Sequence, residues 1–246
     1  MRIAVFGANG RMGTQTCQAV SEAADLDLVA GIDIGDPRDP ALKAEVAVDF
    51  THPDAVMDNI AWCVDNGISV VVGTTGFTSE RIDQVRGMLE AEASLGVLIA
   101  ANFSIGAVLM MNFAAKAAGY FESVEIIEAH HAAKVDAPSG TAAATARLVA
   151  SARQAAAAPA MPDATKQAID GARGATIDGV QVHSLRLPGL IAQQEVRLTS
   201  AGETLSIVSD ARSRSCFMPG VLLGIRWVGA HPGLTLGLEP VLGLSR

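Results

Sequence analysis

This sequence of 246 residues has few cysteines and few positive charges, and each shortage excludes a class of protein. Cys17, Cys63 and Cys216 are odd in number, widely spaced and without a CxxC pair, which indicates free thiols in a reducing compartment rather than disulfides or a zinc site. Lys and Arg total 18 against 26 Asp and Glu, which gives a net charge of −8. This balance disfavours nucleic acid or an anionic membrane as the main partner, although a local cationic pocket can still bind a small anion.

The sequence also lacks a long apolar run. The longest one, around 106–111, is interrupted at Asn112 and Lys116, too early for a membrane span. The N-terminus begins with a strand pattern at Ile3–Phe6 instead of the apolar segment of a signal peptide. We therefore expect a cytoplasmic protein that does not associate with membranes. Half of the residues are apolar, which suits a compact α/β protein with one large core or two modest ones.

A glycine-rich turn near the N-terminus carries the first functional signal. The apolar run 1–6 leads into Gly-Ala-Asn-Gly-Arg-Met-Gly at 7–13, a helix is predicted over 11–24, and a second strand over 28–32 ends at Asp33. Glycines allow the backbone to approach a pyrophosphate, and a helix N-terminus offers amides and a positive dipole end. Asp33 is placed to accept hydrogen bonds from ribose hydroxyls. The pattern predicts dinucleotide binding, and the alternative is a structural tight turn.

Polar clusters follow the next predicted strands of this half, which end near Phe50, Val72 and Ala101. The carboxyl ends of parallel strands line the crevice in which a nucleotide lies, so three such clusters strengthen the prediction of a cofactor cleft. The predicted cofactor-binding residues are Gly7, Ala8, Asn9, Gly10, Arg11, Met12, Asp33, Gly73, Thr74, Thr75, Ala100, Ala101, Asn102 and Phe103. Asp33 would repel a 2′-phosphate, which favours NADH, but the nearby Arg38 leaves NADPH open.

The segment 128–141, Glu-Ala-His-His-Ala-Ala-Lys-Val-Asp-Ala-Pro-Ser-Gly-Thr, concentrates titratable groups. It lies between a predicted strand over 124–127 and a predicted helix over 142–158, and catalytic residues often occupy such loops. Ser139, Gly140 and Thr141 fall at the start of this helix, where they suit a carboxylate. His131 and Lys134 would add positive charge or hydrogen bonds, and Asp136 is expected to orient Lys134 or to cap the turn. Taken alone, the segment is equally compatible with a solvated surface loop.

The sequence pattern after this segment predicts a second domain of a different type. Residues 151–179 decay into an Ala- and Pro-rich surface excursion, and strand patterns follow over 180–187, 195–199 and 204–210. A helix over 217–228 and a strand over 234–238 end the chain. Several strands after one helix indicate an α+β sheet that is distinct from the βαβ half.

The 128–141 motif, the 7–13 turn, Gly73-Thr74-Thr75 and the 101–104 segment, together with Arg214, Phe217 and Gly220, resemble the dihydrodipicolinate reductase family over nearly the whole chain. The resemblance implies an α/β fold in which a Rossmann-type dinucleotide-binding domain, 1–103 completed by 214–246, joins an α+β mixed-sheet domain, 104–213, for substrate binding and oligomerisation. It implies NADH- or NADPH-dependent reduction of 4-hydroxy-tetrahydrodipicolinate, a small cyclic dicarboxylate, in lysine and diaminopimelate biosynthesis, by a homotetramer.

By the same resemblance, His130 is the acid/base and Lys134 a second proton donor. Two positions depart from the family pattern, because Ser209 and Gln193 stand where histidines are common. Two other interpretations stay open at this point. One is another Rossmann dehydrogenase of amino-acid metabolism, which would lack the His-His-x-x-Lys block. The other is a dinucleotide-sensing module without catalysis.

Overall fold

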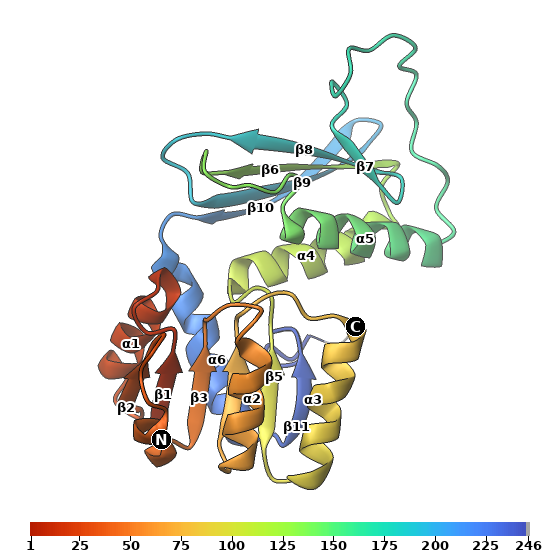
Figure 1. The fold of residues 1–246 in the computed structure, drawn as a ribbon. Coiled ribbons are helices and arrows are strands. Elements are labelled where there is room, and N and C mark those ends of the chain that lie inside the picture. Colours follow the sequence, from red (N-terminus) through yellow and green to blue (C-terminus); the bar gives the residue numbers. More distant parts are fainter. Residues whose placement is uncertain (245–246) are drawn as a thin grey trace. The chain divides into compact units, whose positions relative to one another are not determined.

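A computed structural model describes residues 1–244, and its chain divides into two compact units. The first unit comprises 1–105 together with the described residues from Arg214 onward, and the second comprises 106–213 (Figure 1). A strongly apolar core underlies each unit. The assignment of cofactor to the first and substrate to the second stays a prediction.

The first unit is built on a six-stranded parallel sheet in the order β11-β5-β4-β3-β1-β2. Valine, isoleucine and alanine dominate the central strands, as expected for strands that are buried on both faces. The strands are β1 (Arg2–Phe6), β2 (Asp27–Ile32), β3 (Val46–Asp49), β4 (Ser69–Val72), β5 (Gly96–Ile99) and β11 (Gly233–Leu236).

Helices cover both faces of this sheet (Figure 1). Alternate strand residues such as Val70 and Val72 join a core with α2 (Val56–Asp65) and α3 (Ser79–Ala91). Val71, which points the other way, packs with Leu98 against Gly224 of α6 (Met218–Val228). α1 (Arg11–Glu22) packs beside α6. The fold is therefore the predicted Rossmann-type doubly wound α/β unit.

From β1 the chain adds β2 on one side of the sheet, and from β3 onward it adds strands on the other side. The topological switch point therefore lies between β1 and β3. In open parallel sheets, ligands bind outside the carboxyl ends of the strands at this switch point, because the adjoining connections leave toward opposite faces. The glycine-rich turn follows β1 directly, and Phe50-Thr51 follows β3. Topology thus places the predicted cofactor turn at the crevice of the sheet.

The second unit contains a five-stranded mixed sheet in the order β10-β9-β6-β8-β7. β6 (Ser123–His130) lies at its centre, parallel to β8 (Val180–Arg186) and antiparallel to β9 (Ala192–Ser200), while β10 (Glu203–Ala211) pairs with β9. α4 (Ile105–Ala118) and α5 (Gly140–Ala155) cover one face of this sheet (Figure 1). The predicted α+β mixed-sheet domain is confirmed.

Some sequence predictions of secondary structure were wrong in detail. The segment expected to be an irregular excursion contains β7 (Ala175–Ile177), which pairs antiparallel with β8. Short 3₁₀ helices occupy Asp39–Lys43 and Arg214–Phe217, and neither was predicted. α5 starts two residues early because Ser139 caps it, and it ends at Ala155 because Ala157 adopts a left-handed φ of 50°.

Within residues 1–244, none of the helices combines the length and apolar character that crossing a membrane requires.

Candidate functional site

The glycine-rich turn is shaped by contacts that only glycine permits. Gly7 has a φ of 77°, and a Cβ there would lie 2.5 Å from the carbonyl oxygen of Phe50. A Cβ on Gly13 would lie 1.9 Å from the carbonyl oxygen of Gly7. Gly10 caps α1 without a side-chain hydrogen bond, so no side chain covers the helix N-terminus at that position. This leaves backbone amides and a positive dipole end, which fit a pyrophosphate.

Asp33 ends β2 beside this turn and is held in place by backbone amides. Its carboxylate accepts hydrogen bonds from the amides of Asn9 at 2.8 Å and Ile34 at 2.8 Å. These bonds lower the pKa of Asp33, so the group is an anion near neutral pH. Asp33 and Arg38 both line a cleft of about 390 Å³ together with Gly7, Gly10 and Thr51. A carboxylate and a guanidinium therefore share the cleft in which a ribose is expected.

The loop after β4 is joined to β3 through the buried Asp49. This carboxylate accepts hydrogen bonds from the hydroxyls of Thr74 at 2.6 Å and Thr51 at 2.8 Å, and from the amide of Asn59 at 2.8 Å. Thr74 is thus committed to holding the loop, while Thr75 is exposed. The sequence did not single out Asp49, because a lone acid at a strand end carries no distinctive spacing.

The predicted cofactor residues at the end of β5 are placed differently from one another. Ala100 is buried and its amide donates to the carbonyl of Val72. Ala101 is exposed and Asn102 accepts a hydrogen bond from the amide of Ser104. The Phe103 ring is only 3% exposed and packs edge-on against Phe50 with centroids 5.9 Å apart. Phe103 therefore supports Phe50, which lines the cleft, from within the core. Of the other predicted residues, Arg11 is exposed and Ala8 and Met12 are half-buried.

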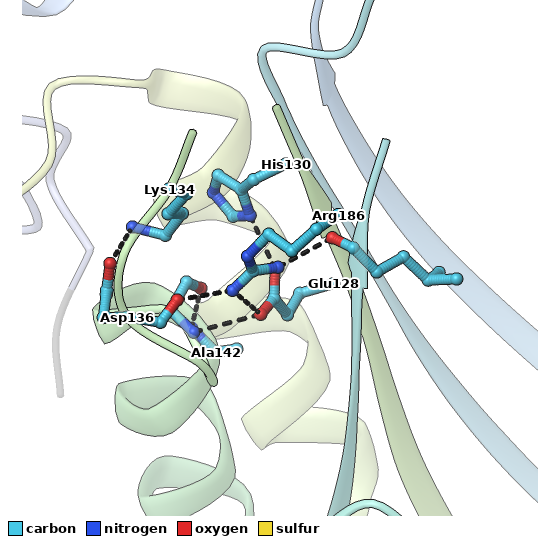
Figure 2. A network of polar contacts seen from close by, with 8 residues as sticks. Glu128, His130, Lys134, Asp136, Ala142 and Arg186 are labelled. Carbon is cyan, nitrogen blue, oxygen red and sulfur yellow. Dashed lines mark hydrogen bonds and ion pairs between the residues drawn. The ribbon is translucent and has the colours of Figure 1, made fainter. Parts of the chain in front are cut away.

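The predicted catalytic His130 closes β6 and is bound to a buried acid. Its Nδ1 lies 2.6 Å from Oε2 of Glu128, two residues earlier on the same face of the strand. Arg186, opposite His130 on β8, donates to both oxygens of Glu128, at 3.0 and 2.9 Å. Figure 2 shows the imidazole and the guanidinium converging on this carboxylate. The Glu128 side chain is fully buried.

Lys134 lies on the loop beyond His130, and its Nζ is 2.8 Å from Oδ1 of Asp136. The expectation that Asp136 orients Lys134 is confirmed (Figure 2). The carbonyl of Asp136 accepts a hydrogen bond from Arg186 at 2.6 Å, so the same guanidinium holds this loop. His131 is half-buried at the start of the loop.

Ser139, Gly140 and Thr141 form the start of α5 as predicted. Ser139 is the N-cap, and its hydroxyl accepts from the amide of Ala142 at 3.1 Å while its own amide donates to Glu128 at 3.1 Å. Ser139 is buried, so its first role is to fix the loop. A Cβ on Gly140 would meet nothing within 4 Å, which leaves open space above the first turn for an anion.

Opposing influences set the charges in this cluster. Burial raises the pKa of Glu128, but donors on Arg186, Ser184, His130 and Ser139 outweigh it and lower that pKa. Burial lowers the pKa of His130, and Lys134 and Arg186 act in the same direction against the raising effect of Glu128. At neutral pH the cluster therefore holds an ionised Glu128 beside a neutral imidazole whose Nδ1 donates to it, because a carboxylate only accepts.

The two departures from the family pattern lie on the strands beside this cluster. Gln193 and Gln194 are on β9, and Gln194 donates to the hydroxyl of Thr145 at 2.8 Å. Ser209 on β10 faces Gly106 of α4, where an added Cβ would lie 3.3 Å from the Ser209 Oγ. At the two departing positions, Ser209 is a short side chain and Gln193 is half-buried beside the bonded Gln194. Arg186, by contrast, is not predicted from the sequence, because a single arginine at the end of a strand has no distinctive spacing.

The first unit is a doubly wound sheet of the dinucleotide-binding type, and the second carries a histidine supported by a carboxylate. This combination is typical of an oxidoreductase. The family described as dihydrodipicolinate reductase, N-terminus, matches residues 1–103, and its C-terminus counterpart matches 106–242. The chain belongs to the dihydrodipicolinate reductase family.

Curated relatives extend over the full length. The chain is 56% identical to a 4-hydroxy-tetrahydrodipicolinate reductase of Cutibacterium acnes, with complete coverage of both chains. It is 55% identical to the protein of the same name from Mycolicibacterium gilvum, again over all of both chains. A dipicolinate-bound dihydrodipicolinate reductase from Paenisporosarcina sp. TG-14 superposes with a TM-score of 0.85 at 38% identity, covering 98% of each chain. An aspartate semialdehyde dehydrogenase from Vibrio cholerae, at 10% identity and a TM-score of 0.51, shares the fold alone.

Proposed function

We propose that this protein catalyses the NAD(P)H-dependent reduction of 4-hydroxy-tetrahydrodipicolinate to tetrahydrodipicolinate in lysine and diaminopimelate biosynthesis. The observation that carries the proposal is the cluster of His130, Lys134 and the α5 N-terminus on a chain related over its full length to reductases of that name. The reaction exchanges a ring hydroxyl for hydrogen, so it consumes a hydride and a proton and releases water. The site must therefore bind a diacid and deliver a proton.

The first unit offers a fitting site for the dinucleotide. The close approach of Gly13 to Gly7 leaves no room for a side chain, and the uncapped start of α1 faces the same turn. We assign the pyrophosphate to this turn and the adenosine ribose to Asp33. We assign the remainder of the cofactor to the residues around 73–75 and 100–103, which follow β4 and β5 and are not among the residues that line the cleft of about 390 Å³. The bound nicotinamide supplies the hydride. Asp33 favours NADH, and Arg38 in the same cleft keeps NADPH as a second donor.

The second unit offers donors for a cyclic dicarboxylate. The open space above Gly140 at the positive end of α5 suits one carboxylate, and the Thr141 hydroxyl belongs to the same turn. Lys134, which is 22% exposed, and His131 supply further donors. The relative from Paenisporosarcina carries dipicolinate, a planar diacid of this class, in its structure. These contacts let an acidic protein hold a dianion.

His130 is the proton donor in this proposal, and Lys134 is a second one. Glu128 holds Nδ1, so Nε2 is the ring nitrogen left to exchange a proton with substrate. Desolvation together with Lys134 and Arg186 lowers the pKa of His130, so its imidazolium form is a strong acid. A bound dianion favours this form, and Nε2 takes up the proton from solvent before delivering it to the substrate. Lys134 lies within the same loop and is oriented by Asp136.

Assembly as a homotetramer in the cytoplasm completes the proposal. The face of the second sheet that turns away from α4 and α5 exposes Leu185 (43%) and Val208 (53%) among polar side chains. A half-apolar sheet face of this kind suits association between copies. Size-exclusion chromatography with light scattering would measure the mass, and a monomer at micromolar concentration would contradict the assembly.

A coupled assay tests the activity. The preceding synthase forms the substrate in situ from pyruvate and aspartate semialdehyde, and oxidation of NADH and of NADPH is followed separately. We expect turnover that depends on the synthase. Binding of NADH without turnover would instead favour a dinucleotide-sensing module. Oxidation driven by aspartate semialdehyde alone, without the synthase, would favour a different dehydrogenase.

A further inference from the structure

The carboxylate of Glu128 accepts four hydrogen bonds from three residues, and the Ser184 side chain also helps to keep it ionised. Oε1 accepts from the amide of Ser139 and from Nη2 of Arg186, at 3.1 and 2.9 Å. Oε2 accepts from Nδ1 of His130 and from Nη1 of Arg186, at 2.6 and 3.0 Å. A fully buried acid needs such compensation to stay ionised. The ring of His130 is thus one of several groups that hold the charge.

Arg186 connects this acid to the loop that carries Lys134. The guanidinium donates to the carbonyl of Asp136 at 2.6 Å, and Asp136 in turn pairs with Nζ of Lys134 at 2.8 Å. Arg186 itself is only 20% exposed, and a further hydrogen bond to the carbonyl of Leu185 anchors it to its own strand. The two predicted proton donors are therefore joined through one guanidinium.

We propose that Glu128 and Arg186 are positioning residues for the reduction: Glu128 fixes the tautomer and direction of His130, and Arg186 holds both Glu128 and the Lys134–Asp136 loop. The inference rests on the proposed function. With Nδ1–H bound inward, Nε2 of His130 alone exchanges the proton. A buried ion pair kept only for stability is replaceable by apolar side chains. Here Glu128, the acid of the buried ion pair, also accepts a hydrogen bond from His130, the residue proposed to exchange the proton.

The opposite face of the same strand provides a matched control. Glu125, three residues before Glu128 on β6, also binds a histidine and an arginine: Oε2 lies 2.8 Å from Nε2 of His183, and Oε1 pairs with Arg173. Glu125 differs by facing away from the candidate site and by being 34% exposed. The same substitution at both acids separates positioning from a general loss of an ion pair.

Glu128→Gln keeps the shape of the side chain but leaves one acceptor oxygen for the four N–H donors. The new NH₂ group must then face another donor, or His130 must adopt the other tautomer so that its Nδ1 accepts a hydrogen bond from it. We expect kcat to fall between ~10-fold and ~10⁴-fold, the upper figure being that for a protease histidine whose supporting aspartate became an amide. The KM for NADH should not change. Glu125→Gln lies on the sheet face proposed for association, so its mass is compared with that of the wild type by light scattering. With that mass unchanged, it should keep the kcat and KM of the wild type.

The pH profile gives a readout that a purely structural role would not move. The charged groups around His130 are Glu128 on β6, Arg186 on β8 and Lys134 on the loop. By contrast, β9 places Ala192 opposite His130, and the N-cap of α5 is the uncharged Ser139. Glu128 raises the pKa of His130 and the two cations lower it. Removing the Glu128 charge should therefore lower the pKa of His130. The limb of the activity–pH profile that depends on His130 should then move to lower pH. Glu125→Gln should leave that limb in place.

A measurement on the unaltered protein keeps the test independent of variant folding. Imidazole ¹⁵N NMR of the wild type should show neutral His130 protonated at Nδ1, and an Nε2–H tautomer would overturn the inference. The inference would also be overturned if folded Glu128→Gln kept the kcat and the pH profile of the wild type. If the unaltered protein showed no synthase-dependent turnover, the proposed function would be refuted instead. An unfolded Glu128→Gln leaves the decision to the NMR result.

Discussion

Gly13→Ala would test both the construction of the glycine-rich turn and its assignment to the pyrophosphate. A Cβ at Gly13 would lie 1.9 Å from the carbonyl oxygen of Gly7 and 2.8 Å from the Cα of Ala8, whereas ordinary contacts begin at 3.4 Å. Because these neighbours are backbone atoms, no side chain can rotate away. The turn must move by about 1.5 Å, the difference between 3.4 and 1.9 Å, before alanine fits.

Two quantities follow from this displacement. Overpacking of a well-packed site costs about 1–3 kcal/mol, so the free energy of unfolding should fall by that amount. The same movement displaces the first amides of α1 from the pyrophosphate, and a loss of ~1.4 kcal/mol of binding raises the Kd for NADH ~10-fold. Urea unfolding at constant m-value measures the first quantity, and a fluorescence titration with NADH measures the second.

Gly87→Ala is the matched control, because it is the same substitution inside α3 where a Cβ meets nothing within 4 Å. Alanine there should raise the unfolding free energy by about 0.5–1 kcal/mol and leave the NADH affinity unchanged. Wild-type stability in Gly13→Ala would refute the packing of the turn. Reduced stability with wild-type NADH affinity would refute its assignment to the pyrophosphate.

Three further predictions concern single side chains. His130→Gln should lower kcat by ~10²–10⁴-fold with NADH binding intact, and an unchanged kcat in the coupled assay would remove His130 from the chemistry. Arg153→Met should lower the unfolding free energy by at least about 3 kcal/mol in denaturant titration. The reason is that the buried guanidinium donates to four backbone carbonyls, from Ala118 at the end of α4 to Pro159. Wild-type stability in this variant would show those bonds to be dispensable. Burial raises the pKa of Cys63 to about 12, so native protein should resist iodoacetamide there at pH 8 while unfolded protein reacts, and rapid native labelling would contradict this burial.

Local sequence patterns sufficed for much of the fold. The strand, glycine turn, helix and strand at the N-terminus are encoded by short apolar runs and by glycines whose placement the backbone demands. The start of α5 was predicted within two residues, because Ser139 has the chemistry of an N-cap. β7 was missed, since a three-residue edge strand is stabilised by its pairing with β8 and has almost no pattern of its own.

The sequence by itself determined the local chemistry on which the predicted roles rest, because His130, Lys134 and the 7–13 turn combine reactive residue types with specific local spacing. Proton transfer is predicted for the two side chains and phosphate binding for the turn. Only the tertiary structure decided how they are held. Arg186 is 58 residues beyond Glu128 in the chain, and the parallel pairing of β6 with β8 brings it across to the buried carboxylate. Such partnerships depend on strand register between distant segments, which no local periodicity encodes.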